Sequence, residues 1–289
     1  MDERIYKDFK KVNEKVLKLD IIQAIISGLL QGLLEWVPVS SEGILLIFFS
    51  LIGEDITLAF IFAVAMHLPT GIAAIVYFKS EYYQILRDIC NGHREGLIQY
   101  IIYATGATVV TAVPLYIIYR EFLRNLEDLL KFYSAAILVI VGITMIVVGS
   151  LLKNVNKEGG YKDLTSGTRK DYILVGLIQG IAILPGVTRS GVTIAALVWR
   201  KFQKEDVIRG SFILAPIVSI GAFVVELIFG DFQASALKET WLIIAFITAL
   251  ITSIMSIKIM LEIAKKLEYW KLLIVIGLIM VALNMIYVI

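Results

Sequence analysis

Long apolar stretches recur along the whole chain and leave few folds open to it. They fall at about 21–37, 43–52, 56–78, 97–119, 132–152, 172–184, 190–199, 210–229, 241–261 and 270–289. A helix that crosses a bilayer needs about 20 apolar residues in succession, and most of these stretches are that long. With 58% hydrophobic residues and a mean hydropathy of +0.83, the chain is far more apolar than a soluble domain. We therefore expect an all-α integral membrane protein that crosses the cell membrane several times.

The polar residues exclude several classes of function. The formal net charge is only +2, so the basic field that attracts nucleic acid is missing and we expect no nucleic-acid partner. Cys90 is the only cysteine in the sequence, so an internal disulfide is impossible. The two histidines, His67 and His93, are too few for a histidine-rich metal cluster.

Two segments, one in each half of the chain, look like copies of each other. Residues 28–43 read GLLQGLLEWVPVSSEG and residues 176–191 read GLIQGIAILPGVTRSG. The first copy contains Glu35 and the second contains Arg189. A charge at bilayer depth costs about 2.5–3.5 kcal/mol, so an intramembrane carboxylate and guanidinium indicate a functional site. Matching, proline-broken segments in two halves also indicate a binding site.

The two copies are expected to be re-entrant hairpins. Stretches 43–52 and 190–199 are about half the length of a membrane span, and each follows a proline and a hydroxyl pair. We interpret 21–52 and 172–199 as a helix, a break and a returning half-helix. Three spanning helices follow each hairpin. Because three is odd, the second half enters from the opposite side, which predicts an inverted-topology repeat with the hairpin tips meeting near the midplane. The alternative is a plain bundle of spans with a Gly-Pro packing motif.

The chain is accordingly divided into four segments of one membrane domain. In residues 1–20, apolar residues recur every three or four positions among charged ones, as in an amphipathic helix at the membrane interface. The first repeat is 21–152, a polar linker is 153–171, and the second repeat is 172–289.

Several conspicuous residues are better explained by packing and anchoring than by chemistry. Gly28 and Gly32, like Gly176 and Gly180, fit the small-x-x-x-small pattern that lets helices approach closely. The tryptophans at segment edges, as expected of interfacial anchors, are Trp36, Trp199, Trp241 and Trp270. Trp36 is alternatively a contact for a lipid substrate.

The polar groups at the breaks suit an anionic head group. Gln31 and Glu35 are four residues apart and share a helix face. Ser40 and Ser41 would cap the returning half-helix, whose free N–H groups and dipole attract anions. The second copy offers the same through Thr188, Arg189 and Ser190, with Thr193 one turn on.

The two charges have complementary uses. Arg189 presents a planar fork that matches phosphate oxygens. Glu35 can hold a divalent cation or take a proton. The alternative is that Glu35 and Arg189 form a purely structural ion pair.

These motifs resemble those of the undecaprenyl-diphosphatase (bacitracin-resistance protein) family. The resemblance rests on Gln31-x-x-x-Glu35 before Pro38-Val-Ser40-Ser41, and on Pro185-Gly186-x-Thr188-Arg189-Ser190-x-x-Thr193. It implies an enzyme that removes the terminal phosphate from undecaprenyl diphosphate and so recycles the carrier lipid for cell-envelope polysaccharides. It also implies inverted repeats with re-entrant hairpins and a divalent cation, Mg²⁺ or Ca²⁺.

The resemblance implies a role for each residue of the motifs. Glu35 would be the essential glutamate and the metal ligand, Arg189 the diphosphate-binding arginine and Ser41 the nucleophile. The substrate-binding side chains would be Gln31, Ser40, Thr188, Ser190, Thr193 and Gln179. A polyprenyl diphosphate lipid is the expected partner, and a homodimer is left open.

One departure from the family pattern affects catalysis. The family usually has Ser-Ser-x-Gly-His, whereas Ile44 stands at the histidine position here. Glu42 adds a second carboxylate beside Ser41. His67, just before Leu68-Pro69-Thr70 where we expect a kink, is a candidate to line the site. A structural hydrogen bond is the other explanation for His67.

The missing histidine keeps a second function open. Inverted repeats with broken helices that meet at the midplane are also typical of transporters. The alternative function is therefore transport of polyprenyl phosphate or a related anionic lipid with little or no hydrolysis. A phosphatase that works through a phosphohistidine fits poorly, because neither His67 nor His93 has the required neighbours.

Overall fold

The structure is a computed structural model of the chain. It describes residues 19–54, 56–93, 95–124, 139, 142–147, 149–150, 153, 160–184, 187–229, 234–266 and 269–288. Nearly all of the predicted amphipathic helix 1–20, much of the linker 153–171, and the motif residues Pro185 and Gly186 lie outside the described residues. Those predictions remain untested.

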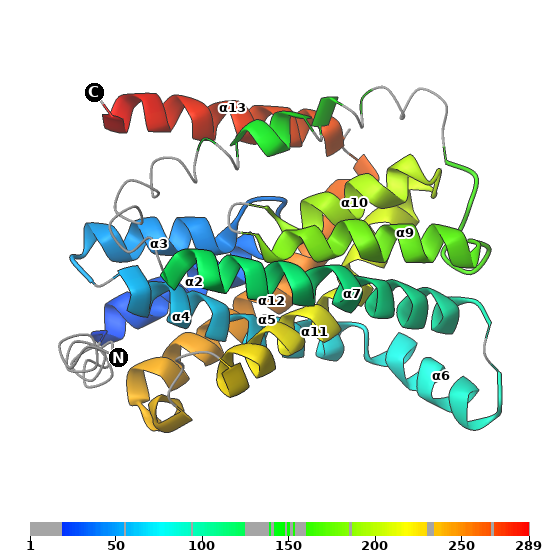
Figure 1. The fold of residues 1–289 in the computed structure, drawn as a ribbon, viewed down its shortest axis with the longest axis horizontal. Coiled ribbons are helices and arrows are strands. Elements are labelled where there is room, and N and C mark those ends of the chain that lie inside the picture. The colour runs from blue at the N-terminus through cyan, green and yellow to red at the C-terminus, as the bar shows by residue number, and fades with distance from the viewer. Residues whose placement is uncertain are drawn as a thin grey trace.

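The described segments are helical, which confirms the all-α prediction (Figure 1). The first half contains α2 (Ile21–Leu34), α3 (Ser41–Leu51), α4 (Ile56–Ala65), α5 (His67–Tyr77), α6 (Lys79–Cys90) and α7 (Leu97–Arg124). The second half contains α9 (Arg169–Gly180), η1 (Ile181–Ile183), α10 (Arg189–Trp199), α11 (Lys204–Phe229), η2 (Ala234–Lys238), α12 (Thr240–Lys266) and α13 (Tyr269–Val288). Within these ranges the only β pairing is an isolated bridge between Lys162 and Phe202.

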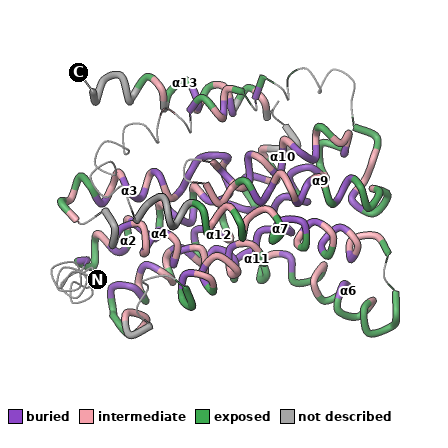
Figure 2. The backbone as a smooth tube through the Cα atoms, in the orientation of Figure 1, coloured by how far each residue is buried: buried purple, intermediate pink, exposed green. Residues whose placement is uncertain are grey.

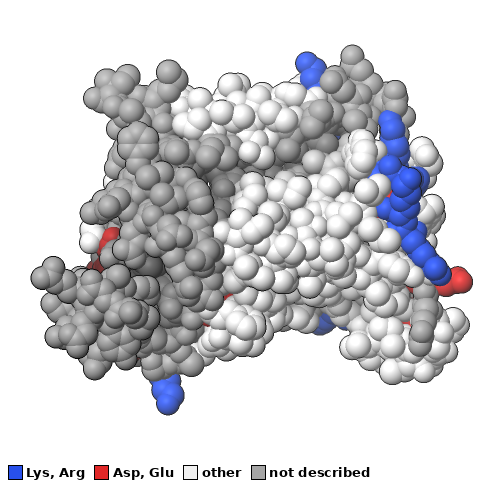
Figure 3. Space-filling model, in the orientation of Figure 1, with Lys and Arg blue, Asp and Glu red and all other residues white. Residues whose placement is uncertain are grey.

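The composition of the long helices agrees with a membrane protein. In the described part of the chain, four helical segments are long and apolar enough to cross a bilayer: Ala59–Tyr77, Leu97–Ile118, Lys204–Phe229 and Thr240–Ile263. Figure 3 shows a broad face without charge, while Lys and Arg gather at one edge of it. An uncharged belt between charged ends is the surface that lipid requires.

Helix starts recur at a constant spacing in the two halves. The starts of α9, α10 and α11 lie 148 residues after those of α2, α3 and α4 (169 − 21, 189 − 41 and 204 − 56). Capping boxes begin the first helix of each set, through Asp20 with Gln23 and through Thr168 with Asp171. The same local signals therefore act at the same places in both copies.

The glycine pairs let α2 and α9 each pack closely against a helix of the other half. A Cβ on Gly28 would lie 2.5 Å from the carbonyl oxygen of Ala245 in α12, and one on Gly176 would lie 2.1 Å from that of Ala104 in α7. Gly32 and Gly180 are equally crowded, by Thr252 and by Thr111. Only glycine allows this approach, so the packing role predicted for the glycine motifs is confirmed.

Two details differ from what the sequence pattern predicts. The stretch 56–78 is broken into α4 and α5 at Met66, slightly before the expected kink, and Pro69 occupies the first turn of α5 where its missing N–H has no cost. Residues 79–96, the charged interval between the apolar stretches 56–78 and 97–119, are helical over Lys79–Cys90 (α6). The charges of α6 hide an amphipathic pattern that buries Ile85 and exposes the opposite face.

The interior of the fold contains polar as well as apolar residues. Figure 2 shows buried positions along the inner sides of the central helices and exposed positions on their outer sides. Around the two helix breaks, the residues that are at most 6% exposed are Gln31, Glu35, Ser40, Ser41, Thr188, Ser190 and Thr193. Buried polar groups in a membrane helix bundle need internal partners. These residues find most of theirs in one another, in nearby backbone groups and in Gln179, whereas Oε1 of Gln31 has none among the described residues.

Candidate functional site

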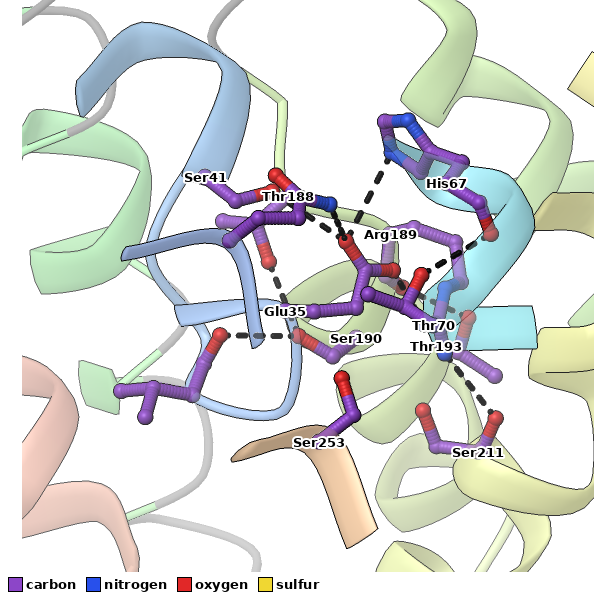
Figure 4. A network of polar contacts seen from close by, with 12 residues as sticks. Glu35, Ser41, His67, Thr70, Thr188, Arg189, Ser190, Thr193, Ser211 and Ser253 are labelled. Carbon is purple, nitrogen blue, oxygen red and sulfur yellow. Dashed lines mark hydrogen bonds and ion pairs between the residues drawn. The ribbon is translucent and has the colours of Figure 1, made fainter. Parts of the chain in front are cut away.

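Glu35 and Arg189 join the two broken segments. Glu35 is the C-terminal cap of α2, and Arg189 is the first residue of α10. Nη2 of Arg189 lies 2.8 Å from Oε1 of Glu35, and the two side chains are only 10% and 5% exposed (Figure 4). The carboxylate and the guanidinium that the sequence singled out thus meet inside the bundle.

The second oxygen of Glu35 is also fully engaged. Oε2 accepts hydrogen bonds from Nε2 of Gln31 at 3.0 Å and from Oγ of Ser41 at 3.2 Å. Gln31 lies one turn before Glu35 on the same face of α2, as its spacing predicts. Ser41 begins α3, so its hydroxyl is oriented toward the carboxylate by the start of the returning helix.

The hydroxyls at the two helix starts cap the helices and link the tips. Oγ of Ser40 accepts from the N–H of Gly43, and Oγ1 of Thr188 accepts from the N–H of Gly191. Ser190 hydrogen-bonds to the carbonyl of Val37, across to the other segment, and to the hydroxyl of Thr188. Two helix N-termini, the ends of a helix that attract anions, therefore lie in one buried region.

Two further residues, Ser211 and Trp36, surround Arg189, and the sequence pattern did not place either of them beside it. Nη1 of Arg189 donates to the backbone carbonyl of Ser211 in α11 at 3.2 Å, and the guanidinium lies 5.7 Å from the ring centre of Trp36. Trp36 is fully buried and packs edge-on against Phe212, with the ring centres 4.9 Å apart. The expectation that Trp36 is an interfacial anchor is therefore wrong. Its position directly after Glu35 was the one signal for its place here.

His67 lies between two carboxylates. Its Nε2 is 3.6 Å from Oε2 of Glu35 and 3.7 Å from Oε1 of Glu42. Its Nδ1 is 3.1 Å from the carbonyl oxygen of Ala63. Carbonyl oxygens only accept, so Nδ1 carries a proton and Nε2 faces the site. The structure thus brings an imidazole to the cluster although Ile44 replaces the family histidine.

Gln179 and Thr193 belong to a different network. Gln179 donates to the hydroxyl of Thr108 in α7 at 2.9 Å and accepts from the hydroxyl of Thr193 at 2.8 Å. Thr193 also donates to the backbone carbonyl of Arg189 at 2.7 Å. Both side chains therefore lie behind the first turn of α10 and support it. The structure does not bring them to the Glu35–Arg189 cluster.

The protein groups do not form a metal site by themselves. Among the residues with described positions, no set of three or more His, Cys, Asp or Glu side chains is arranged to hold a metal ion. Glu35, the expected ligand, has both oxygens engaged with Arg189, Gln31 and Ser41. A divalent ion usually needs several oxygen ligands, and this donor set does not fit one as it stands.

A charged clamp supports α9 and α10 outside the cluster. Asp171 is buried and forms ion pairs with Lys162 at 3.0 Å and with Arg200 at 2.6 Å. Burial raises the pKa of Asp171, but hydrogen bonds from Thr168, Lys162 and Arg200 outweigh it and hold the pKa well below its usual range. The clamp thus ties the beginning of α9 to the end of α10.

Comparison with known proteins places the whole chain in one family. The relatives include the undecaprenyl-diphosphatases of Pyrobaculum islandicum (30% identical over 267 residues, 91% of this chain and 96% of the relative) and Methanopyrus kandleri (30% over 264 residues, 90% and 94%). That of Haloarcula marismortui is 31% identical over 265 residues, 89% of this chain and 94% of the relative. The sequence model described as bacitracin resistance protein BacA matches residues 24–283. Since this match covers both broken segments and the helices that hold them, the chain belongs to the bacitracin resistance protein BacA family.

Proposed function

We propose that the chain is a membrane phosphatase that hydrolyses undecaprenyl diphosphate, or a related polyprenyl diphosphate, to the lipid monophosphate and inorganic phosphate. The reaction recycles the carrier lipid for cell-envelope polysaccharide synthesis. The observation that carries the proposal is the buried meeting of Glu35 and Arg189 at the starts of two helices. The undecaprenyl-diphosphatases among its relatives support the same reaction.

Each residue of the cluster has a chemical role in this reaction. Arg189 and the free N–H groups of α3 and α10 bind the oxygens of the diphosphate and stabilise the charge that develops on them. Oγ of Ser41, or a water in its place, attacks the terminal phosphorus. Glu35 takes the proton from the attacking oxygen, to which it is already hydrogen-bonded at 3.2 Å.

The anhydride P–O bond breaks, and its electron pair leaves with the lipid monophosphate. If Ser41 attacks, a phosphoserine forms and water hydrolyses it in a second step. His67 lines the site and helps to orient Glu35 and Glu42. The distances from its Nε2 to the two carboxylates, 3.6 and 3.7 Å, support this role.

A divalent cation, Mg²⁺ or Ca²⁺, remains part of the proposal, with Glu35 as the ligand that the chain contributes. The remaining ligands would be oxygens of the diphosphate, since the described side chains do not supply a full set. No step above depends on the ion.

The proposed topology is an inverted repeat with two re-entrant hairpins in the cell membrane. Helices α3 and α10 have 11 residues each, about 16 Å at 1.5 Å per residue, and are too short for a core of about 30 Å. The constant offset between helix starts supports two copies of one unit. The domain limits 21–152 and 172–289 and the homodimer remain predictions.

The test is phosphate release from a long-chain polyprenyl diphosphate by the purified protein in detergent, with and without EDTA. Release should require both Arg189 and Glu35, so Arg189→Ala and Glu35→Gln should abolish it. Release at the wild-type rate in either variant would refute the assignment. Binding of the lipid without release by the wild-type protein would favour the transport alternative.

A further inference from the structure

Three buried polar atoms around the ion pair have no hydrogen-bond partner among the described residues. They are Oε1 of Gln31, Nε1 of Trp36 and Oγ of Ser211. Each belongs to a residue that contacts Glu35 or Arg189 through another of its atoms. Buried polar atoms without partners are uncommon in folded proteins and call for an explanation, such as a ligand that binds there.

Ser211 is the most informative of the three. It is fully buried in α11, and its backbone carbonyl accepts a hydrogen bond from Nη1 of Arg189 at 3.2 Å. Figure 4 shows Ser211 beneath the guanidinium, on the side away from His67. Its hydroxyl is therefore carried by a residue that already touches the proposed phosphate-binding arginine.

The unpaired state of this hydroxyl departs from the pattern in the other helices. Buried hydroxyls commonly bond back to the carbonyl four residues earlier, as Ser27 does to Gln23 at 2.7 Å and Thr108 to Ala104 at 2.8 Å. Ser211 makes no such bond within the described structure. The position 148 residues earlier is Ala63, so the hydroxyl occurs only in the copy next to Arg189.

We propose that Ser211 is a further substrate-binding residue, whose hydroxyl donates a hydrogen bond to a diphosphate oxygen held by Arg189. The inference rests on the proposed function, because it takes a polyprenyl diphosphate as the ligand. A hydroxyl that donates to a phosphate oxygen forms a charge-assisted hydrogen bond, which is stronger than a neutral one. The bond also satisfies a group that is left unpaired before the substrate binds.

Replacement of Glu35 by the diphosphate explains why the hydroxyl of Ser211 is left unpaired without substrate. Nη2 of Arg189 is paired with Glu35 in the ligand-free structure, and the diphosphate takes over that side of the guanidinium. Ser211 is held next to the other guanidinium nitrogen, Nη1, by the hydrogen bond to its backbone carbonyl, so its hydroxyl can contact the same anion. Trp36, whose ring centre lies 5.7 Å from the guanidinium, carries a second unpaired donor near the site, its indole Nε1.

The test compares Ser211→Ala with the control Ser27→Ala. Both serines are fully buried in helices, but the hydroxyl of Ser27 bonds to its own helix in α2. The measurements are the dissociation constant for a methylenebisphosphonate analogue of a polyprenyl diphosphate, KM for the diphosphate, and the unfolding temperature of the ligand-free protein.

Ser211→Ala should weaken binding of the analogue and raise KM by about 10-fold or more, the loss expected for one hydrogen bond to a charged group. Its ligand-free unfolding temperature should not fall, because no bond is lost. Ser27→Ala should bind the analogue as the wild-type protein does. Ser211→Cys, which keeps a weak donor of similar shape, should bind with intermediate affinity.

Two outcomes overturn the inference. In the first, Ser211→Ala binds the analogue with wild-type affinity. In the second, its loss of affinity comes with a lower unfolding temperature, which indicates a structural bond. Failure of the proposed function looks different: the wild-type protein releases no phosphate, while Ser211→Ala still loses affinity for the analogue.

Discussion

Nη2 of Arg189 is hydrogen-bonded to Oε1 of Glu35 across 154 residues of sequence. The arginine that would bind the diphosphate is thus paired with the carboxylate that would act as the base. A diphosphate that binds Nη2 of Arg189 would replace Glu35, and this replacement would release the carboxylate next to the hydroxyl of Ser41. In the proposed reaction, substrate binding and activation of the attacking group would then be one exchange of partners.

Removal of Arg189 should damage both activity and stability. Arg189→Ala leaves Glu35 buried without its cation, which should cost about 3–5 kcal/mol of unfolding free energy. Phosphate release should fall at least about 100-fold, as for the loss of other groups that stabilise developing charge. Arg189→Lys is the control: it keeps the charge but loses the fork, so it should recover stability more than turnover. Full activity in Arg189→Ala would contradict the assignment.

Removal of the charge on Glu35 should separate binding from turnover. Glu35→Gln keeps the shape of the side chain but no longer competes with the diphosphate for Arg189. We expect the dissociation constant for a bisphosphonate analogue to stay the same or fall, while kcat falls by about 100-fold or more. Single-turnover phosphate release and analogue binding measure the two effects independently. An unchanged kcat would show that Glu35 is not the base.

His67 should affect turnover without holding the fold together. His67→Ala removes the ring that lies between Glu35 and Glu42, so the carboxylates lose their orientation. We expect kcat to fall by up to about 100-fold, the effect of misplacing a catalytic group by about an ångström. His67→Gln, which retains a polar side chain, should recover part of the rate. Wild-type kinetics in a well-folded His67→Ala protein would exclude this role.

The crowded glycines of α2 and α9 should tolerate no side chain, whereas a glycine of α7 that faces open space should. Gly176→Ala places a Cβ 2.1 Å from the carbonyl oxygen of Ala104, so α9 must move away from α7. Thermal unfolding in detergent should show a loss of about 1–3 kcal/mol. Gly106→Ala in α7 meets no atom within 4 Å and should stabilise by about 0.5–1 kcal/mol. Equal effects of the two changes would contradict the observed packing.

Acid should weaken the clamp around Asp171. Its pKa is lower in the folded protein than the unfolded value of about 3.9, so the ionised carboxyl stabilises the fold at neutral pH. This stabilisation is complete above the unfolded pKa and is lost as pH falls below it toward the folded pKa. Asp171→Asn should lower the unfolding free energy by about 1.5–3 kcal/mol at pH 7 and flatten its decline in acid. The exposed Glu95→Gln variant should behave as wild type; a parallel decline in Asp171→Asn would exclude the clamp.

Much of the fold follows from local sequence signals. Apolar stretches, capping residues and prolines act over one or two turns, and the helices begin and end close to where those signals lie. The pairing of Gln31 with Glu35 is equally local. Helix α6 is harder to predict because it is rich in charge, and only the helical spacing that buries Ile85 indicates it.

The remaining parts of the site depend on contacts between distant segments. Gln179 looks equivalent to Gln31 by motif, yet its partner is Thr108, 71 residues away, and only the packing of α9 on α7 decides this. Ser211 contacts Arg189 because α10 packs against α11, and Trp36 reaches it from the segment after α2, where its ring packs on Phe212 of α11. No spacing within one segment could predict those neighbours.

The crossed packing of the two arms has a consequence for how the chain is made. Gly28 in α2 lies against Ala245 in α12, and its carbonyl accepts from Thr252, which is 224 residues later. During synthesis the glycine face of α2 therefore lacks its final partner, α12, until most of the protein has been made. Arm α9 finds α7 already present, so the second arm can dock at once. The two halves are alike in sequence but differ in the order of assembly. Helix α9 can pack as soon as it is made, whereas α2, which is made first, packs only after α12 has been made.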